Sequence, residues 1–469
     1  MEQEGIETVQ SYLEKAVDRA IQAGADMIIG KGINSIEHQI RFSKNKIDIN
    51  KTWMSRKIEF ILVVGGNQML TGEFSPSSEG SVKTEIDRAI KFAHKVDPSS
   101  QYAGVEDKIQ PFPTLDKTFD EKIDDFVAES TELVNMTIEK AGDAGAKRVA
   151  GSLLFGKKEE AFISSAGPKG EFKSSYYNLT VRAFQEGLDA SGQGLACGIS
   201  LDRIGEEFEK AGKSAGEFSK DHLNCKQGKS GIYDLILSPA VAANLLGGGS
   251  YGGGLMAKAN PDRIMMGRSP FKDEIGEQIA PEFVNIDDNA IIKDGLASAP
   301  FDFEGTPHRI TPLIKNGVLV NFIHNTSTAR KFDTETTGNS ALAKVMMVSK
   351  SLVPRSSNVV FNNGDHSFEE LLEGNKSALY ITCNWYTRFT SEVSTEFSTI
   401  PRDAMFIVES GKIGEPIKNI RISDNLLRMM KNITAMGNDR VQVKWWEVDT
   451  PTWTPTIRIS DCRITTATK

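Results

Sequence analysis

Short apolar runs separated by turn-forming residues fill the second half of the chain, and this pattern constrains the fold more than any other feature. The runs that read as strands are GIYDLILS, RITPLIKNGVLVNFI, NVVF, ALYITCNWY, AMFIVESGKI, RVQVKW and TPTIRIS. Turn residues such as GDHS, ESGK and IKNG recur at short intervals, which is typical of antiparallel hairpins. EELLEG and NLLRMMKNI read as helices. We therefore expect a mainly antiparallel β domain with a few helices over residues 232–469.

The first half combines helical periodicity with strand alternation. Val9, Leu13 and Val17 recur at helical spacing, and Gly24 supplies a stop. The stretches AIQAGADMIIGKG and AGDAGAKRVAGSLLFG share the order helix end, Ala-Gly-Ala and strand. We therefore predict an α+β domain over residues 1–220, built from two related halves in which a helix precedes an antiparallel sheet. The polar segment DHLNCKQGKSG, residues 221–231, is the predicted linker.

Net charge and cysteine use restrict the partners and the compartment. The 469 residues carry a net charge of −8 at pH 7, which disfavours binding to the phosphate backbone of nucleic acids. Cys197, Cys225, Cys383 and Cys462 stand far apart and predict free thiols in a reducing compartment. The N-terminus lacks the basic and apolar regions of a signal peptide, and no apolar run approaches the length of a membrane span. We expect a cytoplasmic protein without membrane contact.

The stretch LSPAVAANLLGGGSYGGGLM, in the middle of the chain, spells G-x-G-x-x-G at Gly247, Gly249 and Gly252. A dinucleotide loop needs the order strand, glycine-rich turn and helix, because the helix N-terminus faces the pyrophosphate. Here a strand leads into Ser238 as an N-cap and Pro239 at the first helical position, so the glycines follow the helix. We expect Gly247 to be the left-handed residue at the helix end, and the glycines to form a flexible connector.

Residue chemistry alone identifies no metal site and no acid–base pair. His222 and Cys225 are the nearest pair of metal-ligand types, but zinc needs three or four convergent ligands, so we interpret them as polar linker residues. Asp287 and Asp288 are interpreted as a solvated pair rather than as acid–base machinery.

The segment HNTSTARK places Ser327 between His324 and Arg330. A nucleophile and its base need a third group that orients them, and the sequence shows none nearby. A capped turn that opens a short helix is the favoured interpretation of this segment.

The segment from Asp294 to Ser340 resembles the signature of the TldD/PmbA family, once described as modulators of DNA gyrase. The matching pieces are GLASAPFDFEGTP, LIKNGVL, STARK and TTGNS. NLLRMMKNITAMGND, FIVESGKI and the closing TPTIRIS also fit. The resemblance is clear over about residues 230–465, whereas the N-terminal half fits in outline.

The resemblance implies a cytoplasmic peptidase system in which a TldD-type subunit pairs with a TldE-type (PmbA) subunit. The TldD type carries H-E-x-x-x-H on a helix, and a cysteine from the C-terminal region completes its metal site. The family positions of that motif fall here on Ser238, Pro239 and Ala243, none of which can act as a zinc ligand or a general base. The region of the family cysteine, VKWWEVDTPTW, contains none, and Cys462 comes too late.

The leading hypothesis is a non-catalytic TldE/PmbA-type subunit of a heterodimeric metallopeptidase that acts on unfolded peptides or peptide precursors. No catalytic or metal residue is assigned to this chain, and zinc is expected in the TldD-type partner. Signature residues that could form a peptide groove are Ser327, Arg330, Thr337, Gly338 and Asn339.

Two alternatives remain open on sequence alone. One is a homodimeric peptidase that is active through an unrecognised site, such as Ser327, His324 and Arg330. The other is a gyrase- or DNA-associated modulator, which the acidic charge disfavours. Whether the chain is itself an enzyme is left open.

Overall fold

The computed structural model describes residues 8–99, 102–187, 190–249, 253–345, 349–374 and 377–466. The first half forms one curved antiparallel sheet with the strand order β3-β2-β1-β4-β5-β6. Its strands are β1 (Met27–Ser43), β2 (Lys46–Val64), β3 (Gln68–Phe74), β4 (Arg148–Ser164), β5 (Lys169–Phe184) and β6 (Ser191–Gly198).

The sheet is assembled from two copies of the same element order. Each copy runs helix, three strands, helix, and the copies meet where β1 pairs with β4. The helices are α1 (Val9–Gln22), α2 (Glu79–Ala93), α3 (Phe126–Asp143) and α4 (Ile204–Asp221). In α1, Leu13, Ala16 and Ala20 form a buried stripe at helical spacing, while Thr8 caps the N-terminus. This order confirms the two predicted helix-then-sheet halves.

The second half contains a closed barrel. β8 (Gly231–Leu237) pairs in parallel with β15 (Ala378–Ser391) and antiparallel with β22 (Ile457–Thr466). The ring continues through β18 (Ile420–Asn425) and β16 (Glu396–Glu409), which pairs with β15 and closes it. The strands β7 (Lys226–Gln227), β17 (Lys412–Lys418) and β19 (Ile433–Met436) extend it.

A second, mixed sheet lies beside the barrel in the order β11-β10-β9-β14-β21-β20. Its strands are β9 (Ile286–Asn289), β10 (Ile310–Lys315), β11 (Val318–Leu319), β14 (Val359–Phe361), β20 (Val441–Trp445) and β21 (Val448–Thr454). β12 (Ser340–Val345) and β13 (Ser349–Pro354) form a hairpin. The short helices are α5 (Pro239–Leu245), α6 (Pro261–Met265), α7 (Thr326–Lys331), α8 (Phe368–Leu372), α9 (Leu426–Lys431), and the 3-10 turns η1 (Glu121–Ile123) and η2 (Met256–Lys258).

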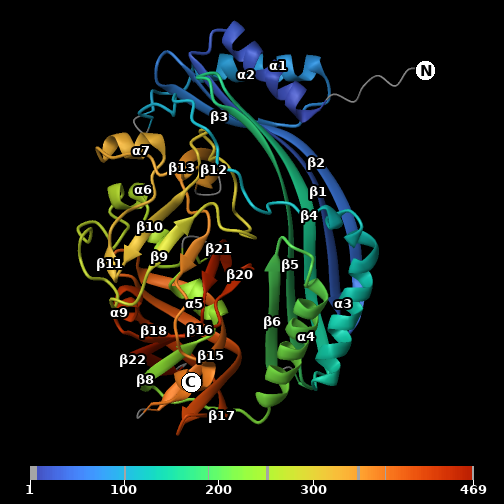
Figure 1. Cartoon of the computed structure of the whole chain (residues 1–469), viewed down its shortest axis with the longest axis vertical. Helices are drawn as coiled ribbons and strands as arrows, with labels where there is room; N and C mark the ends of the chain where they lie inside the picture. The colour runs from blue at the N-terminus through green and yellow to red at the C-terminus, as the bar shows by residue number, and fades with distance from the viewer. Residues whose placement is uncertain are drawn as a thin grey trace.

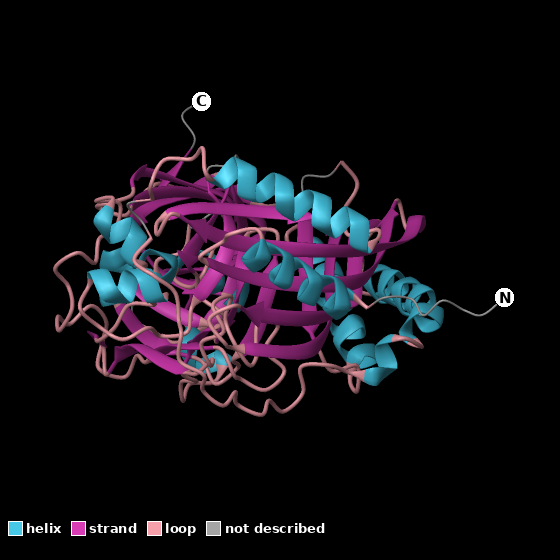
Figure 2. Cartoon of the chain, turned by 90° about the horizontal axis from the view of Figure 1, so that it is seen from above, coloured by secondary structure: helices cyan, strands magenta, loops and turns pink. Residues whose placement is uncertain are grey.

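The curved sheet arches along the second half, and its concave face is turned toward it (Figure 1). α3 and α4 lie on the outer side of the sheet, and α1 and α2 lie at its upper end. Seen from above, strands occupy the interior and most helices lie around them (Figure 2). Among the described residues, no helix combines the length and apolar character that crossing a membrane requires.

Candidate functional site

Helix α5 begins directly at the end of the barrel strand β8. Ser238 is its N-cap, and the Ser238 hydroxyl donates a hydrogen bond to the carbonyl oxygen of Thr382 at 2.8 Å. Pro239 occupies the first helical position, where a missing N–H costs nothing. The helix ends at Leu245. The predicted strand, Ser-Pro start and short helix are therefore confirmed.

Of the three positions to which the family resemblance assigns the metal motif, Ser238 and Ala243 are buried and Pro239 is half-buried. Ala243 is completely buried in a cluster that consists of Ala243, Cys383, Val443, Trp445 and Val448. An imidazole at this position would have to displace close-packed side chains. The hydroxyl of Ser238 is already committed to its cap and to the carbonyl of Thr382. These residues do not fit a zinc ion.

Cys383 is the thiol within this cluster, and its surroundings favour the neutral form. Its Sγ lies 3.0 Å from Oε1 of Gln193 and accepts a hydrogen bond from Nε1 of Trp385. Burial, followed by the negative charge of Asp403, raises the pKa of this thiol well above its ordinary value. A zinc-binding cysteine needs the opposite shift, because the thiolate is the ligand. Within the described part of the chain, no three His, Cys, Asp or Glu side chains are placed to hold a metal together.

The glycines after α5 allow the backbone to pack closely on β21. A Cβ atom on Gly248 would lie 2.4 Å from Cβ of Thr450, and the Gly248 N–H donates to Oγ1 of Thr452 at 3.1 Å. Gly249, with φ +54°, is left-handed. Gly247 is not, so its predicted left-handed conformation is wrong: the position needs space against Thr452 rather than positive φ.

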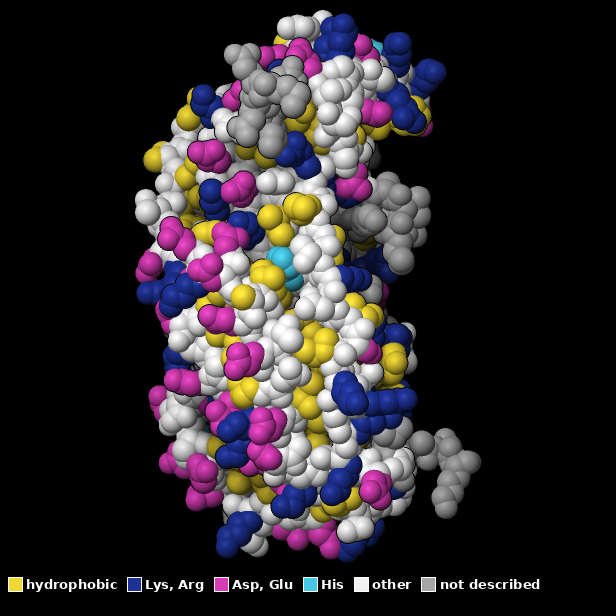
Figure 3. All heavy atoms as spheres, turned by 90° about the vertical axis from the view of Figure 1, so that its right-hand side faces the viewer, with side chains coloured by type: hydrophobic (Ala, Val, Ile, Leu, Met, Phe, Trp, Pro, Cys, Tyr) yellow, Lys and Arg dark blue, Asp and Glu magenta, His cyan; other side chains and the backbone are white. Residues whose placement is uncertain are grey.

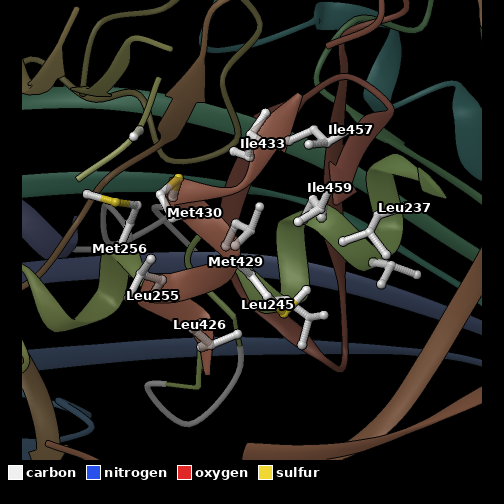
Figure 4. Close-up of a cluster of buried hydrophobic side chains, with 14 of the residues drawn as sticks. Leu237, Leu245, Leu255, Met256, Leu426, Met429, Met430, Ile433, Ile457 and Ile459 are labelled. Carbon is white, nitrogen blue, oxygen red and sulfur yellow. The ribbon is translucent and has the colours of Figure 1, made fainter. Parts of the chain in front are cut away.

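We call residues 247–254 the glycine tail, and this segment is described only in part. The predicted connector includes residues 250–252, which lie outside the described residues. On either side of them the chain is ordered in the core, because Leu245 and Leu255 belong to one apolar cluster with Met256 and Met429 (Figure 4). The tail therefore connects two anchored segments.

A cavity of about 450 Å³ lies between the concave face of the curved sheet and the signature segment. We call it the central cavity. β1, β4 and β5 supply one wall, with Lys31, Glu160 and Phe172 among its residues. Ser298, Asp302, Phe303, His308 and Asn339 of the signature line the opposite wall, and Lys444, Asp449, Thr450 and Pro451 close the side formed by β20 and β21.

The PFDFEGTP motif contains two buried carboxyl groups, Asp302, which lines the cavity, and Glu304. Asp302 accepts hydrogen bonds from the backbone N–H groups of Glu304, Thr306 and Ser340. Glu304 is completely buried and accepts the N–H of Thr326 at 3.0 Å. Burial, followed by the charge of Asp302, raises the pKa of Glu304. The motif therefore connects the cavity wall to α7 through buried carboxyl groups.

Ser327 and Arg330 hold a segment of the chain's own first half. The Ser327 hydroxyl accepts the Ala103 N–H at 3.1 Å and donates to the Gly104 carbonyl at 3.0 Å. The guanidinium of Arg330 donates to the carbonyls of Ala103 and Val105 at 2.6 and 3.2 Å. All four contacts are to backbone atoms. Gly104 has φ +100°, and a Cβ atom there would lie 1.7 Å from Nη1 of Arg330, so this contact requires glycine at position 104.

The set Ser327, His324 and Arg330 is not arranged as a nucleophile with its base. The His324 ring pairs with the Thr328 hydroxyl at 3.3 Å, while the Ser327 hydroxyl is engaged by the backbone of residues 103–104. Burial lowers the pKa of His324 to about 4. The preferred interpretation, a capped short helix, is confirmed: Asn325 caps α7.

Thr337 and Gly338 precede Asn339, which lines the central cavity. The Thr337 hydroxyl donates to Oδ1 of Asn339 at 2.6 Å, and Gly338 is left-handed with φ +72°. Nδ2 of Asn339 donates to Asp288 at 3.1 Å. Of the five predicted groove residues, Asn339 reaches the cavity, while Ser327 and Arg330 contact the chain's own segment instead.

Two sequence interpretations are wrong. Asp288 is not solvated: it is 1% exposed and accepts the N–H of Ser357 as well as the Asn339 amide. His222 is not a polar linker residue: it is 3% exposed, and its Nε2 lies 2.8 Å from the Ile417 carbonyl. In both cases the partners are distant in sequence, so local polarity gave no signal.

Three basic residues of the central cavity were missed by sequence reasoning. Lys158 comes from β4, Arg355 follows β13, and Lys444 comes from β20. They are scattered over almost 300 positions of a chain that is acidic overall. No local motif could have brought them together.

The fold and the site define the chain as an α+β protein in which a curved sheet and a strand-rich second half with a barrel enclose a charged cavity. Residues 230–466 match the family described as PmbA/TldA metallopeptidase C-terminal domain. The chain belongs to the PmbA/TldD family.

Curated relatives and solved structures agree with this assignment. A metalloprotease of Methanothermobacter thermautotrophicus is 29% identical over 324 residues, which cover 66% of this chain and 67% of that protein. A metalloprotease of Methanocaldococcus jannaschii is 25% identical over 374 residues, which cover 77% and 79%. The crystal structure of TldE from Thermococcus kodakarensis superposes with a TM-score of 0.83 at 16% identity, covering 97% of this chain and 100% of that one. The last likeness shows a shared fold.

Proposed function

We propose that this chain is a non-catalytic subunit of the TldE/PmbA type that completes a cytoplasmic metallopeptidase with a TldD-type partner. One observation carries the proposal. The family resemblance assigns the second histidine of the metal motif to Ala243 of helix α5, and this residue is buried in an apolar cluster. The relatives are named metalloproteases, and the fold is that of TldE.

In such a complex the partner's metal would activate water and polarise the scissile carbonyl. The residues of this chain would contribute binding and shape instead. The central cavity offers charged and apolar walls to a peptide segment. The buried carboxylates Asp302 and Glu304 fix the signature segment that forms one of those walls.

The surface of the molecule agrees with a protein partner better than with DNA. On the face drawn in Figure 3, acidic and basic side chains are interspersed, and the net charge of the whole chain is −8. A DNA-binding surface would concentrate Lys and Arg on one face.

The decisive experiment compares the isolated chain, a TldD-type subunit that carries H-E-x-x-x-H, and their mixture. We expect size-exclusion chromatography to show a heteromeric species, with zinc stoichiometric to the partner alone. We expect cleavage of unstructured peptides by the mixture and none by this chain alone. Changing the motif glutamate of the partner to glutamine should abolish the activity of the mixture.

Two results would contradict the proposal. The first is tight stoichiometric zinc in the isolated chain. The second is peptidase activity of the isolated chain that a chelator leaves intact and that Ser327→Ala removes, which would support the homodimeric alternative.

A further inference from the structure

Three cations converge on one side of the central cavity. Lys158, Arg355 and Lys444 all line it. The Lys444 ammonium donates to the backbone carbonyl of Asp449 at 2.6 Å, and the Lys158 ammonium lies 5.6 Å from the centre of the Tyr176 ring. In the described part of the chain, no Asp or Glu forms a salt bridge with any of the three. The acidic protein therefore keeps three positive charges in one cavity, and none of them has an ion-pair partner among the described residues.

The other charges of the cavity are already neutralised. Glu160 pairs with Lys31 at 3.0 Å. Glu59 pairs with Lys57 and Lys350 at 2.7 and 2.6 Å. Asp302 is occupied by three backbone N–H groups. Among the described residues, the negative charge of Asp449 acts on Lys444, while the positive charges of Arg355 and Lys158 oppose it.

The positive charges act on one another. Burial and the nearby positive charges of Arg355 and Lys158 lower the pKa of Lys444, although Asp449 acts in the opposite direction. Bringing like charges together raises the free energy of the folded protein, and an anion that enters the recess relieves this repulsion.

The volume and the apolar lining of the cavity restrict which anions it can bind. A volume of about 450 Å³ is within the range of pockets that hold small molecules or a few residues of a peptide. Ile33, Phe172 and Leu296 provide apolar surface beside the cations. A carboxylate attached to an apolar side chain satisfies both features, because Lys and Arg form charge-assisted hydrogen bonds with carboxylates.

We propose that the central cavity binds the C-terminal carboxylate of a peptide, through Lys158, Arg355 and Lys444. This deepens the proposed function, since the substrates of a peptidase complex include unfolded peptides with free C-termini. The C-terminal residue would lie against the apolar wall, and the preceding residues would leave the cavity toward the partner subunit.

The test is direct binding to the full isolated chain by calorimetry. The probe is an N-acetylated tetrapeptide of three alanines and a terminal leucine, compared as free acid and as C-terminal amide. We expect the free acid to bind about tenfold to a hundredfold more tightly, because charge-assisted hydrogen bonds are lost with the amide. Lys444→Met and Arg355→Gln should abolish the difference, while Lys444→Arg should retain it.

Matched controls separate this effect from misfolding and from other anions. Lys272→Met removes an exposed charge elsewhere and should leave the preference unchanged, and unfolding curves check that each variant is folded. Equal binding of acid and amide would overturn the proposal. So would inorganic phosphate that binds at the three cations while the tetrapeptide acid does not. Because no partner subunit is present, a negative result here leaves the pairing experiment unaffected.

Discussion

Arg182 and Asp403 form a salt bridge of 2.5 Å that joins β5 of the curved sheet to β16 of the barrel. The Asp403 side chain is completely buried, and the Arg182 side chain is 24% exposed. The same carboxylate accepts the Ser191 hydroxyl at 2.9 Å, and the guanidinium stacks 4.3 Å from the centre of the Trp385 ring. The two halves of the chain are thus joined by a charge pair that has largely left water.

Removing one member of this pair should be costly. Arg182→Met leaves the Asp403 carboxylate buried without its counter-charge, and we expect the free energy of unfolding to fall by about 3–5 kcal/mol. Thermal or urea unfolding measures this. Lys140→Met, which breaks the exposed pair with Glu209, is the control and should change stability within the error of the measurement. Equal effects of the two variants would show that Arg182 and Asp403 do not stabilise the contact between the halves.

The glycine tail gives a second prediction. Gly248→Ala places a Cβ 2.4 Å from Cβ of Thr450, so β21 or α5 must shift, and we expect a loss of about 1–3 kcal/mol in the free energy of unfolding. Gly142→Ala is the matched control, because nothing lies within 4 Å of its new Cβ on α3. That variant should gain about 0.5–1 kcal/mol from the better helix propensity of alanine. A neutral Gly248→Ala would mean that the tail is a loose connector.

Features that depend on neighbouring residues in the chain could be predicted from the sequence, whereas features that depend on distant contacts could not. Ser238 and Pro239 predicted the start of α5 because capping depends on neighbours in the chain. Asp288 was misread because its partners Asn339 and Ser357 lie 51 and 69 residues away. The division into domains at residues 221–231 stays a prediction.

The same distinction applies to the candidate site. The family positions on α5 could be located from sequence, but the packing of Ala243 beside Cys383 and Trp445 could not. The central cavity is lined by residues of β4 and β20, and β20 contacts the curved sheet at β5 and β6, an arrangement that follows from the tertiary fold alone.

The buried carboxyl of Glu304 gives a pH prediction. Its pKa is raised by burial and by Asp302, so the folded state holds the proton more tightly than the unfolded state. As pH rises above the ordinary value of 4.5, the unfolded state releases its proton first and the folded protein loses stability. Glu304→Gln lacks this effect, so its stability relative to wild type should increase from pH 5 to pH 8. Unfolding curves across this range test it, with exposed Glu335→Gln as the control. A constant difference between Glu304→Gln and wild type would show that the pKa is not raised.

The hydrogen bonds between α7 and residues 103–105 can be removed selectively. Arg330→Met removes two hydrogen bonds to the carbonyls of Ala103 and Val105. We expect faster amide hydrogen exchange in this segment, because its local opening becomes easier, with little change in global stability. Exchange measured by mass spectrometry on peptides that cover residues 102–106 is the readout. Lys315→Met, an exposed change on β10, should leave exchange there unaltered. Unchanged exchange in Arg330→Met would show that other packing holds the segment.

Restoring the metal motif tests whether this chain retains a metal pocket. The triple change Ser238→His, Pro239→Glu and Ala243→His rebuilds H-E-x-x-x-H on α5. Position 243 is completely buried, so the second imidazole meets apolar side chains where a zinc ion would have to lie. We expect a loss of about 1–3 kcal/mol in the free energy of unfolding from overpacking, and no stoichiometric zinc by elemental analysis.

The volume control is Ala243→Leu, which adds bulk without a ligand and should destabilise the chain to a similar degree. If the triple variant instead bound one zinc ion tightly and became more stable with metal, this would show that the chain keeps the space for a zinc ion although it lacks the ligands. Failure to bind zinc, together with similar destabilisation in both variants, would mean that this end of α5 has been remodelled as core. In that case, exchanging three residues does not recreate the space that a zinc ion requires, because the neighbouring side chains are already close-packed.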